Sequence, residues 1–443
     1  MIRVASAAAL ALAAGLSFGP VITPAPAPAP VSLWDHGRAG ADSPRVASFL
    51  TALGRTDPVV CEMISDQIGN FWMSGAGGLG RLLDDPDLAQ GAKDSLSGSV
   101  SDPRAIGLLV ATLSTNDPCV RRVAAKLLGR SAATNEALRE LLANPSSRVR
   151  EAAAMATGEN ERRELVGPLE RLLGDSVAGP AAMAAWALGE IQDPSSETAL
   201  IQAVHSSAAR VRLAGVWALG ELQDASAAKE VVPMLRDPDA AMRATAAEAL
   251  GEMKSARTGA ALVGALTDRS ANVREAAVRA LSDLRERSAI PALEGMVVND
   301  PDPDIRRAAA SALGDFSAAR SLDPLTRALS DRDPDVQRDA AEAIGNLEDI
   351  SKAPTALVRA SASPDLELRR RATRTLGKIG DPATLQALAD RLADEDKDVR
   401  LAAVEGLGEM KVQSAVSSLT RALGDRDPEV RRAAAEALGK SRE

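Results

Sequence analysis

Apolar residues recur at helical spacing within one sequence unit that is repeated along most of the chain. The clearest copy is DPEVRRAAAEALG at residues 427–439, with close copies at 302–314 and 333–345. If the arginine that follows the valine is position 0, apolar residues occupy −1, +3, +4, +6 and +7. This spacing places them on one side of a helix. Each copy is therefore predicted to form an amphipathic helix with one buried face.

The repeat holds its period along the chain, and this predicts the architecture. Position 0 recurs every 28 to 32 residues, with arginine in most copies and Cys61, Ala89, Ala181 or Gln337 in the others. One helix of this kind cannot bury its apolar face alone, so neighbouring units must stack. We expect an all-α, α-α superhelix: a continuous solenoid of about thirteen helical hairpins.

Residues at the two ends of each copy predict how its helix starts and stops. Asp302 is placed to cap the free N–H groups of a helix, and the following proline suits the first helical position. The glycine at +8, as in Gly314, is expected to take the left-handed conformation that ends a helix. The segments 289–298 and 322–330 are expected to form the partner helices, with Pro291 and Pro324 in their first turns.

The string D-P-x-V-R-x-x-A-A-x-A-L-G resembles HEAT repeats of the short type named for phycobilisome lyases, over about residues 42–443. The resemblance implies that the second helix of each hairpin lines a concave face. It also implies that the recurrent Asp and Arg residues form ladders between neighbouring repeats. Such repeats serve as scaffolds, adaptors and a few enzymes, so the fold alone does not choose the function.

The amino terminus predicts export. Arg3 precedes an apolar run over residues 4–18, and a Pro/Ala-rich stretch at 23–30 follows. This order is typical of a secretory signal, and the run is short for a membrane span, which needs about 20 residues. We divide the chain into a leader (1–30), irregular N-terminal repeats (31–102) and a regular solenoid (103–443). The expected location is periplasmic or secreted; the alternative is a membrane anchor formed by an uncleaved leader.

Composition narrows the partners and cofactors. A formal net charge of −9 argues against nucleic acid as the main partner. Two histidines and two cysteines leave little material for a metal site, and we expect no metal and no cofactor. Regular stacking would hold Cys61 and Cys119 roughly 20 Å apart. We therefore expect no disulfide between them, because a disulfide requires Cα atoms within about 7 Å.

The main candidate binding site is an apolar row on the polar side of the repeat. Trp186 and Trp217 occupy position +5 of consecutive units, and Met155 fills that position one unit earlier. Most other units carry a charged or polar residue there. Ala182 and Leu213, at +1, extend the apolar surface. Exposed aromatic patches often bind proteins or peptides. The alternative is that the indoles lie flat and cover the alanine-rich helices beneath them.

Two further surfaces are candidates. A basic cluster that includes Arg369 and Arg371 could hold an anionic partner, and we select from it Arg306, Arg307, Arg338, Arg370 and Arg374. The alternative is a solvated face, because Asp339 and Glu342 lie among these arginines. The last unit follows the consensus rather than a polar capping sequence, which predicts possible self-association through the C-terminal repeat.

These observations favour an exported, non-catalytic protein–protein interaction scaffold or adaptor. One alternative is an enzyme of the HEAT-like lyase type, and another is a tethered regulatory ectodomain of a membrane partner. The sequence contains no His-Glu dipeptide, as paired di-iron sites of HEAT-like hydroxylases use, no GxSxG and no Walker A loop. An active site built only from Asp and Glu remains an alternative.

Overall fold

The computed structural model describes residues 42–55, 102–131, 133–255, 257–410 and 413–440. In these ranges the chain contains α-helices, short 3-10 helices and turns, and no β-strand. The contacts divide the chain into two compact units, residues 1–233 and 234–443. The predicted leader, residues 1–30, lies outside the described residues. Among the described helices, none combines the length and apolar character that a membrane crossing requires.

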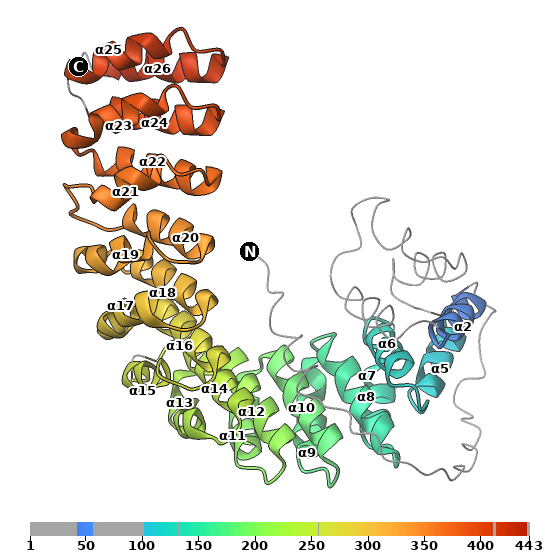
Figure 1. Ribbon diagram of the computed structural model, residues 1–443. Helices are drawn as coiled ribbons and strands as arrows, with labels where there is room; N and C mark the ends of the chain where they lie inside the picture. Colours follow the sequence, from blue (N-terminus) through green and yellow to red (C-terminus); the bar gives the residue numbers. More distant parts are fainter. Residues whose placement is uncertain (1–41, 56–101, 132, 256, 411–412, 441–443) are drawn as a thin grey trace. The chain divides into compact units, whose positions relative to one another are not determined.

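The first unit consists of helical hairpins, drawn in blue to green in Figure 1. Its helices are α2 (Asp42–Leu53), α5 (Pro103–Thr112), α6 (Pro118–Gly129), α7 (Asn135–Leu142), α8 (Ser147–Gly158), α9 (Val166–Leu172), α10 (Ala178–Ile191), α11 (Glu197–Val204), α12 (Ala209–Glu221) and α13 (Ala228–Val231). Three short 3-10 helices precede first helices of the hairpins: η2 (Arg163–Leu165), η3 (Pro194–Ser196) and η4 (Ala225–Ala227). A further one, η5 (Val232–Arg236), leads into the second unit.

The second unit repeats the same hairpin, drawn in yellow-green to red in Figure 1. Its helices are α14 (Ala240–Glu252), α15 (Gly259–Ala265), α16 (Ala271–Asp283), α17 (Ile290–Asn299), α18 (Pro303–Asp315), α19 (Leu322–Ala328), α20 (Pro334–Ile344), α21 (Thr355–Ala360), α22 (Leu366–Ile379), α23 (Leu385–Arg391), α24 (Lys397–Glu409), α25 (Gln413–Ala422) and α26 (Pro428–Lys440). Its 3-10 helices are η6 (Arg287–Ala289), η7 (Ala319–Ser321) and η8 (Pro382–Thr384).

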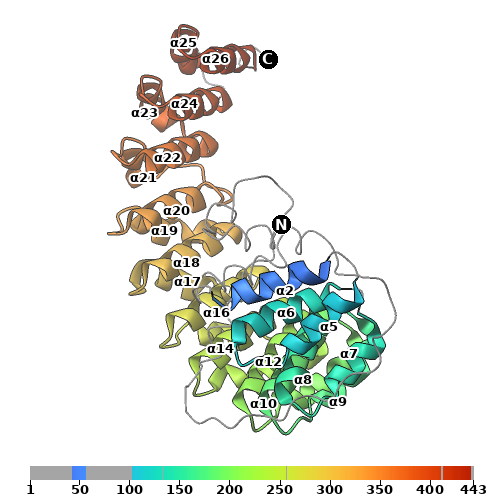
Figure 2. The ribbon, with the colours of Figure 1, turned by 90° about the vertical axis from the view of Figure 1, so that its right-hand side faces the viewer.

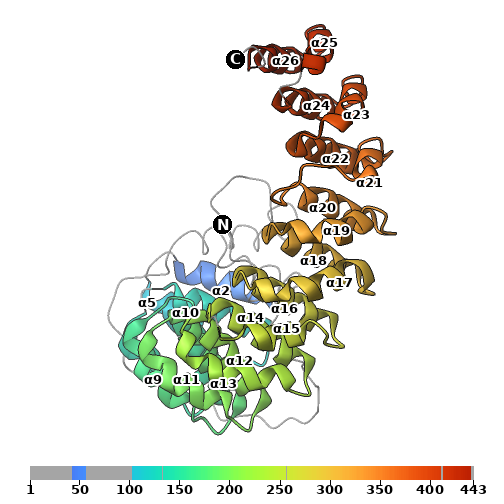
Figure 3. The same ribbon diagram turned by 90° about the vertical axis from the view of Figure 1, so that its left-hand side faces the viewer.

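Within each unit the hairpins form two layers. Figures 2 and 3 show α22, α24 and α26 in one layer of the second unit and α21, α23 and α25 in the other. Successive second helices contact one another directly, as α8, α10 and α12 do in the first unit. The predicted apolar positions form the core between the layers: Ile305, Ala309, Ala310, Ala312 and Leu313 of α18 are all buried. The all-α solenoid of HEAT-like hairpins is thus confirmed.

The predicted helix starts are also confirmed. Asp302 accepts a hydrogen bond from Asp304 N at 2.9 Å and caps α18, with Pro303 in the first turn. The partner helices begin within a residue of the expected positions, and Pro291 and Pro324 lie in their first turns. A proline there costs no hydrogen bond, because the first N–H groups of a helix have no partner within it.

The expected role of the repeated glycine is wrong. Gly314 lies inside α18, and the left-handed residue is the non-glycine Ser317, with φ of 52°. The glycine instead allows neighbouring second helices to approach, because a Cβ there would lie 3.0 Å from Ala343 Cα of the next repeat. The small residue is required by packing between repeats, which the pattern within one helix does not reveal.

The expectation that no disulfide joins the two cysteines is also wrong. Cys119, at the start of α6, is disulfide-bonded. Cys61, the only other cysteine of the chain, lies outside the described residues. The expectation assumed regular stacking between the two cysteines, but α2 packs directly against α5 and α6. A Cβ at Gly54 would lie only 3.7 Å from Val120 Cγ2, so the end of α2 lies close to the residue that follows Cys119.

Candidate functional site

Position +5 of the second helix differs between the two units. In the second unit every +5 residue is exposed: Glu248, Arg279, Ser311, Glu342, Arg374, Glu405 and Glu436. In the first unit the corresponding side chains, Lys126, Met155, Trp186 and Trp217, are half-buried. The large apolar side chains therefore stand in a row that the repeat otherwise presents to solvent, but each is partly covered.

The two tryptophans are held by the glycine at +8 of the preceding repeat. A Cβ at Gly158 would lie 2.9 Å from Trp186 Cζ3, and a Cβ at Gly189 would lie 2.8 Å from Trp217 Cζ3. The benzo edge of each indole thus occupies the space that the missing glycine side chain leaves. This packing fixes the rings without burying them fully, and binding of a partner by the indoles stays a prediction.

The remaining edge of each indole is available for contact. Nε1 lies on the side of the ring opposite Cζ3, so burying Cζ3 directs the N–H edge away from the helices beneath. Neither indole N–H donates a hydrogen bond to the described part of the chain. An aromatic ring with an apolar body and an unsatisfied donor is suited to a partner surface with mixed character.

The other predicted site residues lie on the same helices. Met155 is half-buried and packs against the core of the first unit. Ala182 packs against a small buried cluster of Ala181, Ala203 and Val211. Leu213 is half-buried on α12. Met155, Ala182 and Leu213 are thus partly covered by the core of the first unit, and their role in binding stays a prediction.

Four glutamates on these helices were missed by the sequence interpretation. Glu159, Glu190 and Glu221 occupy position +9 of α8, α10 and α12, and Glu151 occupies +1 of α8. The signal was present in the repeated Ala-Leu-Gly-Glu strings after each tryptophan. We call the residues at +1, +5 and +9 of α8, α10 and α12 the tryptophan face: Glu151, Met155, Glu159, Ala182, Trp186, Glu190, Leu213, Trp217 and Glu221.

The arginine at position 0 forms the ladder that the resemblance implied. Arg306 donates from Nε and Nη2 to Asp331, each at 2.8 Å, and from Nη1 to Asp300 O at 2.8 Å. Asp331 lies in the turn before the second helix of the next repeat. The same pairing joins Arg150–Asp175, Arg243–Asp268, Arg274–Asp300, Arg369–Asp394 and Arg400–Asp425.

The ladder also explains the ionisation of its members. The hydrogen bond to Asp331 raises the pKa of Arg306, and the hydrogen bond from Arg243 lowers the pKa of Asp268. Arg306 is only 3% exposed, so its charge is neutralised inside the structure. These arginines join the repeats.

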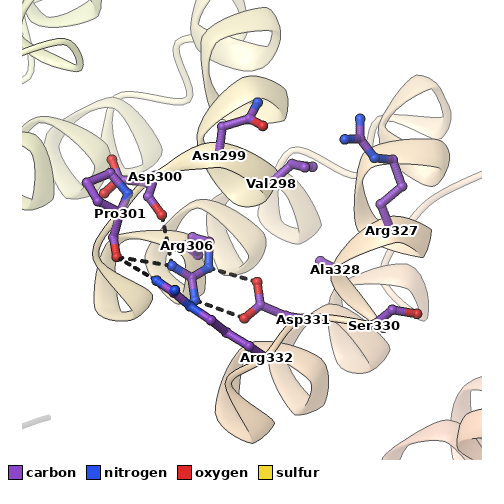
Figure 4. A pocket seen from close by; sticks show the side chains of 10 residues that line it. All are labelled: Val298, Asn299, Asp300, Pro301, Arg306, Arg327, Ala328, Ser330, Asp331 and Arg332. Atoms are coloured by element: carbon purple, nitrogen blue, oxygen red, sulfur yellow. Dashed lines mark hydrogen bonds and ion pairs between the residues drawn. The ribbon is translucent and has the colours of Figure 1, made fainter.

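A cavity of about 480 Å³ lies beside one rung of this ladder, between α17–α18 and α19 (Figure 4). Its polar groups already pair with one another: Arg306 with Asp331, and Arg332 with Pro301 O at 3.3 Å. Arg327 points away from the pair in Figure 4. The contact of Arg332 recurs between Arg269 and Pro238 O at 3.3 Å. The cavity therefore belongs to the repeat and does not gather groups around a ligand.

The predicted anionic-partner patch is largely neutralised by carboxylates. Arg306 lies in the ladder, and Arg307, Arg338 and Arg370 pair with Asp339, Asp365 and Asp396, respectively. Arg374 is exposed and has no ion pair within the described residues. Binding of an anionic partner here stays a prediction, with Arg374 as the member whose charge is not already paired.

Metal-binding residues do not gather in the described part of the chain. No group of three or more His, Cys, Asp or Glu side chains there has the arrangement of a metal site. His205 Nε2 lies 3.2 Å from Glu230 Oε2 in an exposed pair. This pair joins two neighbouring repeats at the surface.

The sequence matches the family of HEAT repeats in overlapping ranges that together run from residue 107 to residue 443. The matched ranges are 107–180, 135–211, 168–240, 197–270, 228–314, 260–345, 296–365, 322–398 and 390–443. No curated protein matches the chain.

Solved structures are similar in fold. Importin beta is 16% identical with a TM-score of 0.60, and the match covers 87% of this chain and 61% of that one. Kap95p, solved with RanGDP, is 15% identical with a TM-score of 0.51, over 89% of this chain and 60% of that one. The chain thus spans about three fifths of each. The phycocyanin lyase complex of CpcE and CpcF from Nostoc sp. PCC7120 is 25% identical over 55% of this chain and 94% of that one, but its TM-score is 0.32.

Proposed function

This chain belongs to the HEAT-repeat family, and we propose that it is a non-catalytic adaptor that binds a protein or peptide on its tryptophan face. The observation that carries the proposal is the pair of indoles in consecutive repeats, Trp186 and Trp217. Each is fixed by a glycine of the preceding repeat while its N–H edge stays unpaired within the described residues. Rigid, half-exposed tryptophans are typical anchors of protein interfaces.

The fold supports a binding adaptor rather than an enzyme. HEAT-repeat solenoids present long surfaces made of equivalent helices, and such surfaces suit extended partners. Kap95p, which is similar in fold, binds RanGDP. The tryptophan face offers apolar area, donors and carboxylates, but it has no nucleophile paired with a base.

The proposal is tested by crosslinking the protein to its partner in the native cell envelope and then pulling the protein down with whatever it has captured. Replacing Trp186 and Trp217 together by Glu should abolish capture, while circular dichroism shows unchanged helical content. The matched control replaces Glu342 and Glu405, which occupy the same +5 position in the second unit, by Ala and should capture normally.

Two results would contradict the proposal. The first is a Trp186→Glu/Trp217→Glu protein that folds and still captures the partner. If that protein unfolds, Trp186→Leu/Trp217→Leu keeps apolar bulk against Gly158 and Gly189 but removes the N–H edges. Undiminished capture by the leucine variant would then show that the binding site lies elsewhere.

Export to the periplasm or the medium is part of the same proposal. It rests on the apolar leader, and the disulfide bond of Cys119 supports it, because disulfides persist in oxidising compartments. Mass spectrometry of the mature amino terminus distinguishes a cleaved leader from a retained membrane anchor. A protein that keeps the leader and stays in the cytoplasm would contradict export.

We also propose weak self-association through the C-terminal repeat. Leu423 is 40% exposed there, and Ala435 on α26 is exposed as well. Association through this small apolar area would make the unfolding midpoint rise with protein concentration. Leu423→Asp should remove that dependence, and a midpoint that does not vary with concentration would contradict the contact.

A further inference from the structure

Along the chain, the arginine at position 0 usually occurs together with an aspartate at one position of the next repeat. This accepting position lies two residues before the N-cap of the next second helix, as Asp331 lies two residues before Asp333. After the position-0 arginines that another repeat follows, the accepting position holds Asp175, Asp237, Asp268, Asp300, Asp331, Asp394 or Asp425, with one exception. The exception is Arg121, whose accepting position holds Asn144.

The copies within the described residues that lack the arginine also lack the aspartate. Ala181 and Gln337 stand at position 0, and the accepting positions that follow them hold Ser206 and Ser363. A change on one side is thus matched by a change on the other, so neither charge of the pair is left alone. Arg121 departs from this rule, because the arginine is kept and its carboxylate is not.

The side chain of Arg121 has the orientation of a ladder arginine but forms no ion pair within the described residues. Its Nη1 donates to Thr115 O at 2.7 Å, just as Arg306 Nη1 donates to Asp300 O at 2.8 Å. In Arg306 the remaining edge of the guanidinium, Nε and Nη2, binds Asp331. The same edge of Arg121 has no acceptor in the described chain and is open to solvent. Such an edge can bind one carboxylate through two parallel hydrogen bonds.

Two further arginines lie beside this edge. Arg148, the second residue of α8, donates to Asn116 Oδ1 and so lies on the turn whose Thr115 O holds Arg121. Arg122 is the next residue of α6 and is half-buried. Neither Arg148 nor Arg122 forms an ion pair within the described residues. At the six paired rungs, the position that corresponds to Arg148 holds no cation; it holds Gly179, Asn272, Asp304, Asp335, Asp398 or Glu429.

The electrostatic surroundings of Arg121 also differ from those of a paired rung. Burial lowers the pKa of Arg121; the charge of Glu151 opposes this effect, and the two neighbouring arginines add to it. At a paired rung the direction is reversed, because the hydrogen bond to Asp331 raises the pKa of Arg306. Three guanidinium charges face only Glu151 and the capping carboxylate of Asp117, so the cluster stays cationic in a chain whose net charge is −9.

The missing partner has the chemistry of the group that it replaces. In every paired rung the acceptor is a side-chain carboxylate, and the two extra arginines suit a ligand that carries more than one such group. We call Arg121, Arg122, Arg148 and Asn144 the open rung. We propose that the open rung binds the carboxylates of an acidic segment of another protein. This site goes beyond the tryptophan face and does not depend on it.

The proposal is tested with the full-length protein and a short peptide of alternating Gly and Asp, blocked at both ends. The matched probe has Asn in place of each Asp. Calorimetry should show binding of the Asp peptide about tenfold tighter than binding of the Asn peptide. The net charge of −9 would by itself repel the Asp peptide, so general attraction cannot give this result. Equal affinity for the two peptides, or tighter binding of inorganic phosphate than of the Asp peptide, would overturn the inference.

The sharpest variant supplies the missing carboxylate from within the chain. Asn144→Asp should raise the urea midpoint of unfolding and weaken binding of the Asp peptide about tenfold or more, because the edge of Arg121 is then occupied. The control, Asn272→Asp, adds the same charge at an exposed position beside the paired rung of Arg243 and Asp268, and should leave affinity unchanged. Undiminished binding by Asn144→Asp, or an equal loss in both variants, would overturn the inference.

A second pair of variants tests the cation that the next repeat contributes. Arg148→Gln should weaken binding of the Asp peptide about threefold or more. Arg210→Gln changes an exposed arginine at the same position of α12, where the preceding repeat has Ala181 at position 0, and should bind normally. Equal losses in these two variants would show only long-range electrostatics and would overturn the inference. Trp186→Glu/Trp217→Glu should keep full affinity for the Asp peptide, so the two sites stand or fall separately.

Discussion

The second helices of the two units share one backbone pattern but use their outward positions differently. In the second unit the arginines at +1 are engaged within the structure: Arg307 with Asp339, Arg338 with Asp365 and Arg370 with Asp396. On the tryptophan face the +1 position holds Glu151, Ala182 and Leu213 instead. The same position therefore joins neighbouring repeats through Arg307, Arg338 and Arg370 in the second unit and is apolar at Ala182 and Leu213 in the first.

The comparison also separates two kinds of arginine. The ladder arginines at position 0 are largely buried and bridge consecutive repeats, as Arg150 does in the first unit and Arg306 in the second. Arginines at +1 are more exposed and pair across the outward surface; the side chain of Arg307 is 41% exposed. A count of basic residues treats both kinds alike, although only exposed and unpaired arginines can attract an anionic partner.

The largest expected effect comes from breaking a rung of the ladder. Arg306→Ala leaves the carboxylate of Asp331 without its guanidinium in a site where that side chain is only 10% exposed. Removing one partner of a buried ion pair costs about 3–5 kcal/mol of unfolding free energy. Urea denaturation followed by circular dichroism measures the loss, and peptide binding to the tryptophan face should not change.

Arg307→Ala is the matched control for this prediction. Its side chain is partly exposed, so its loss should cost less than about 1 kcal/mol. If Arg306→Ala and Arg307→Ala were equally destabilising, the distinction between the buried ladder and the surface pairs would be wrong.

A smaller effect is expected from filling the space beneath Trp217. In Gly189→Ala the new methyl group would lie 2.8 Å from Trp217 Cζ3 and 2.9 Å from Ala218 Cα. Overpacking of this kind costs about 1–3 kcal/mol. The ring must also move, so partner capture should weaken and tryptophan fluorescence should shift.

Gly251→Ala separates the two consequences of overpacking. Its methyl group would lie 2.9 Å from Ala280 Cα, in a second-unit contact that involves no tryptophan. This variant should lose similar stability while keeping full capture and unchanged fluorescence. If Gly189→Ala also kept full capture, the position of the Trp217 ring would be irrelevant to binding.

Periodicity within one helix was enough to predict the fold. The apolar spacing around Val430, the cap at Asp302 and the proline at Pro303 are local signals, and the structure contains the elements they indicate. The ladder was reached through the resemblance to HEAT repeats. Its partners lie about 25 residues apart, as Arg306 and Asp331 do, and no local pattern joins them.

The errors share a physical cause, which is contact between repeats. Gly314 was assigned to the end of its own helix because the sequence does not show Ala343 packed against it. Cys119 was expected to be unpaired because the position of α2 beside α6 does not follow from the period. The row of Met155, Trp186 and Trp217 was visible in the sequence, but the seating of the two indoles needed the contacts of Gly158 and Gly189.

The smallest expected effect concerns stability in acid. It depends on two ion pairs that arginines at +1 form in the second unit. Arg338 lowers the pKa of Asp365, and Arg370 lowers the pKa of Asp396, in each case to about 2 from an ordinary 3.8. Because the folded-state pKa is depressed, each pair contributes stability above pH 3.8 and loses it as the pH falls toward 2. The contribution is on the order of 1 kcal/mol per pair after solvent screening.

Replacing Arg338 and Arg370 by Ala makes these positions resemble Ala182 of the first unit. The variant should therefore be less stable than the wild type at pH 6, but it should lose less unfolding free energy between pH 4 and 2. Arg374→Ala, which removes an exposed arginine without an ion pair in the described chain, should follow the wild-type curve. Parallel unfolding curves for the wild type and the double variant, measured by urea denaturation across this range of pH, would show that these pairs do not set the acid stability.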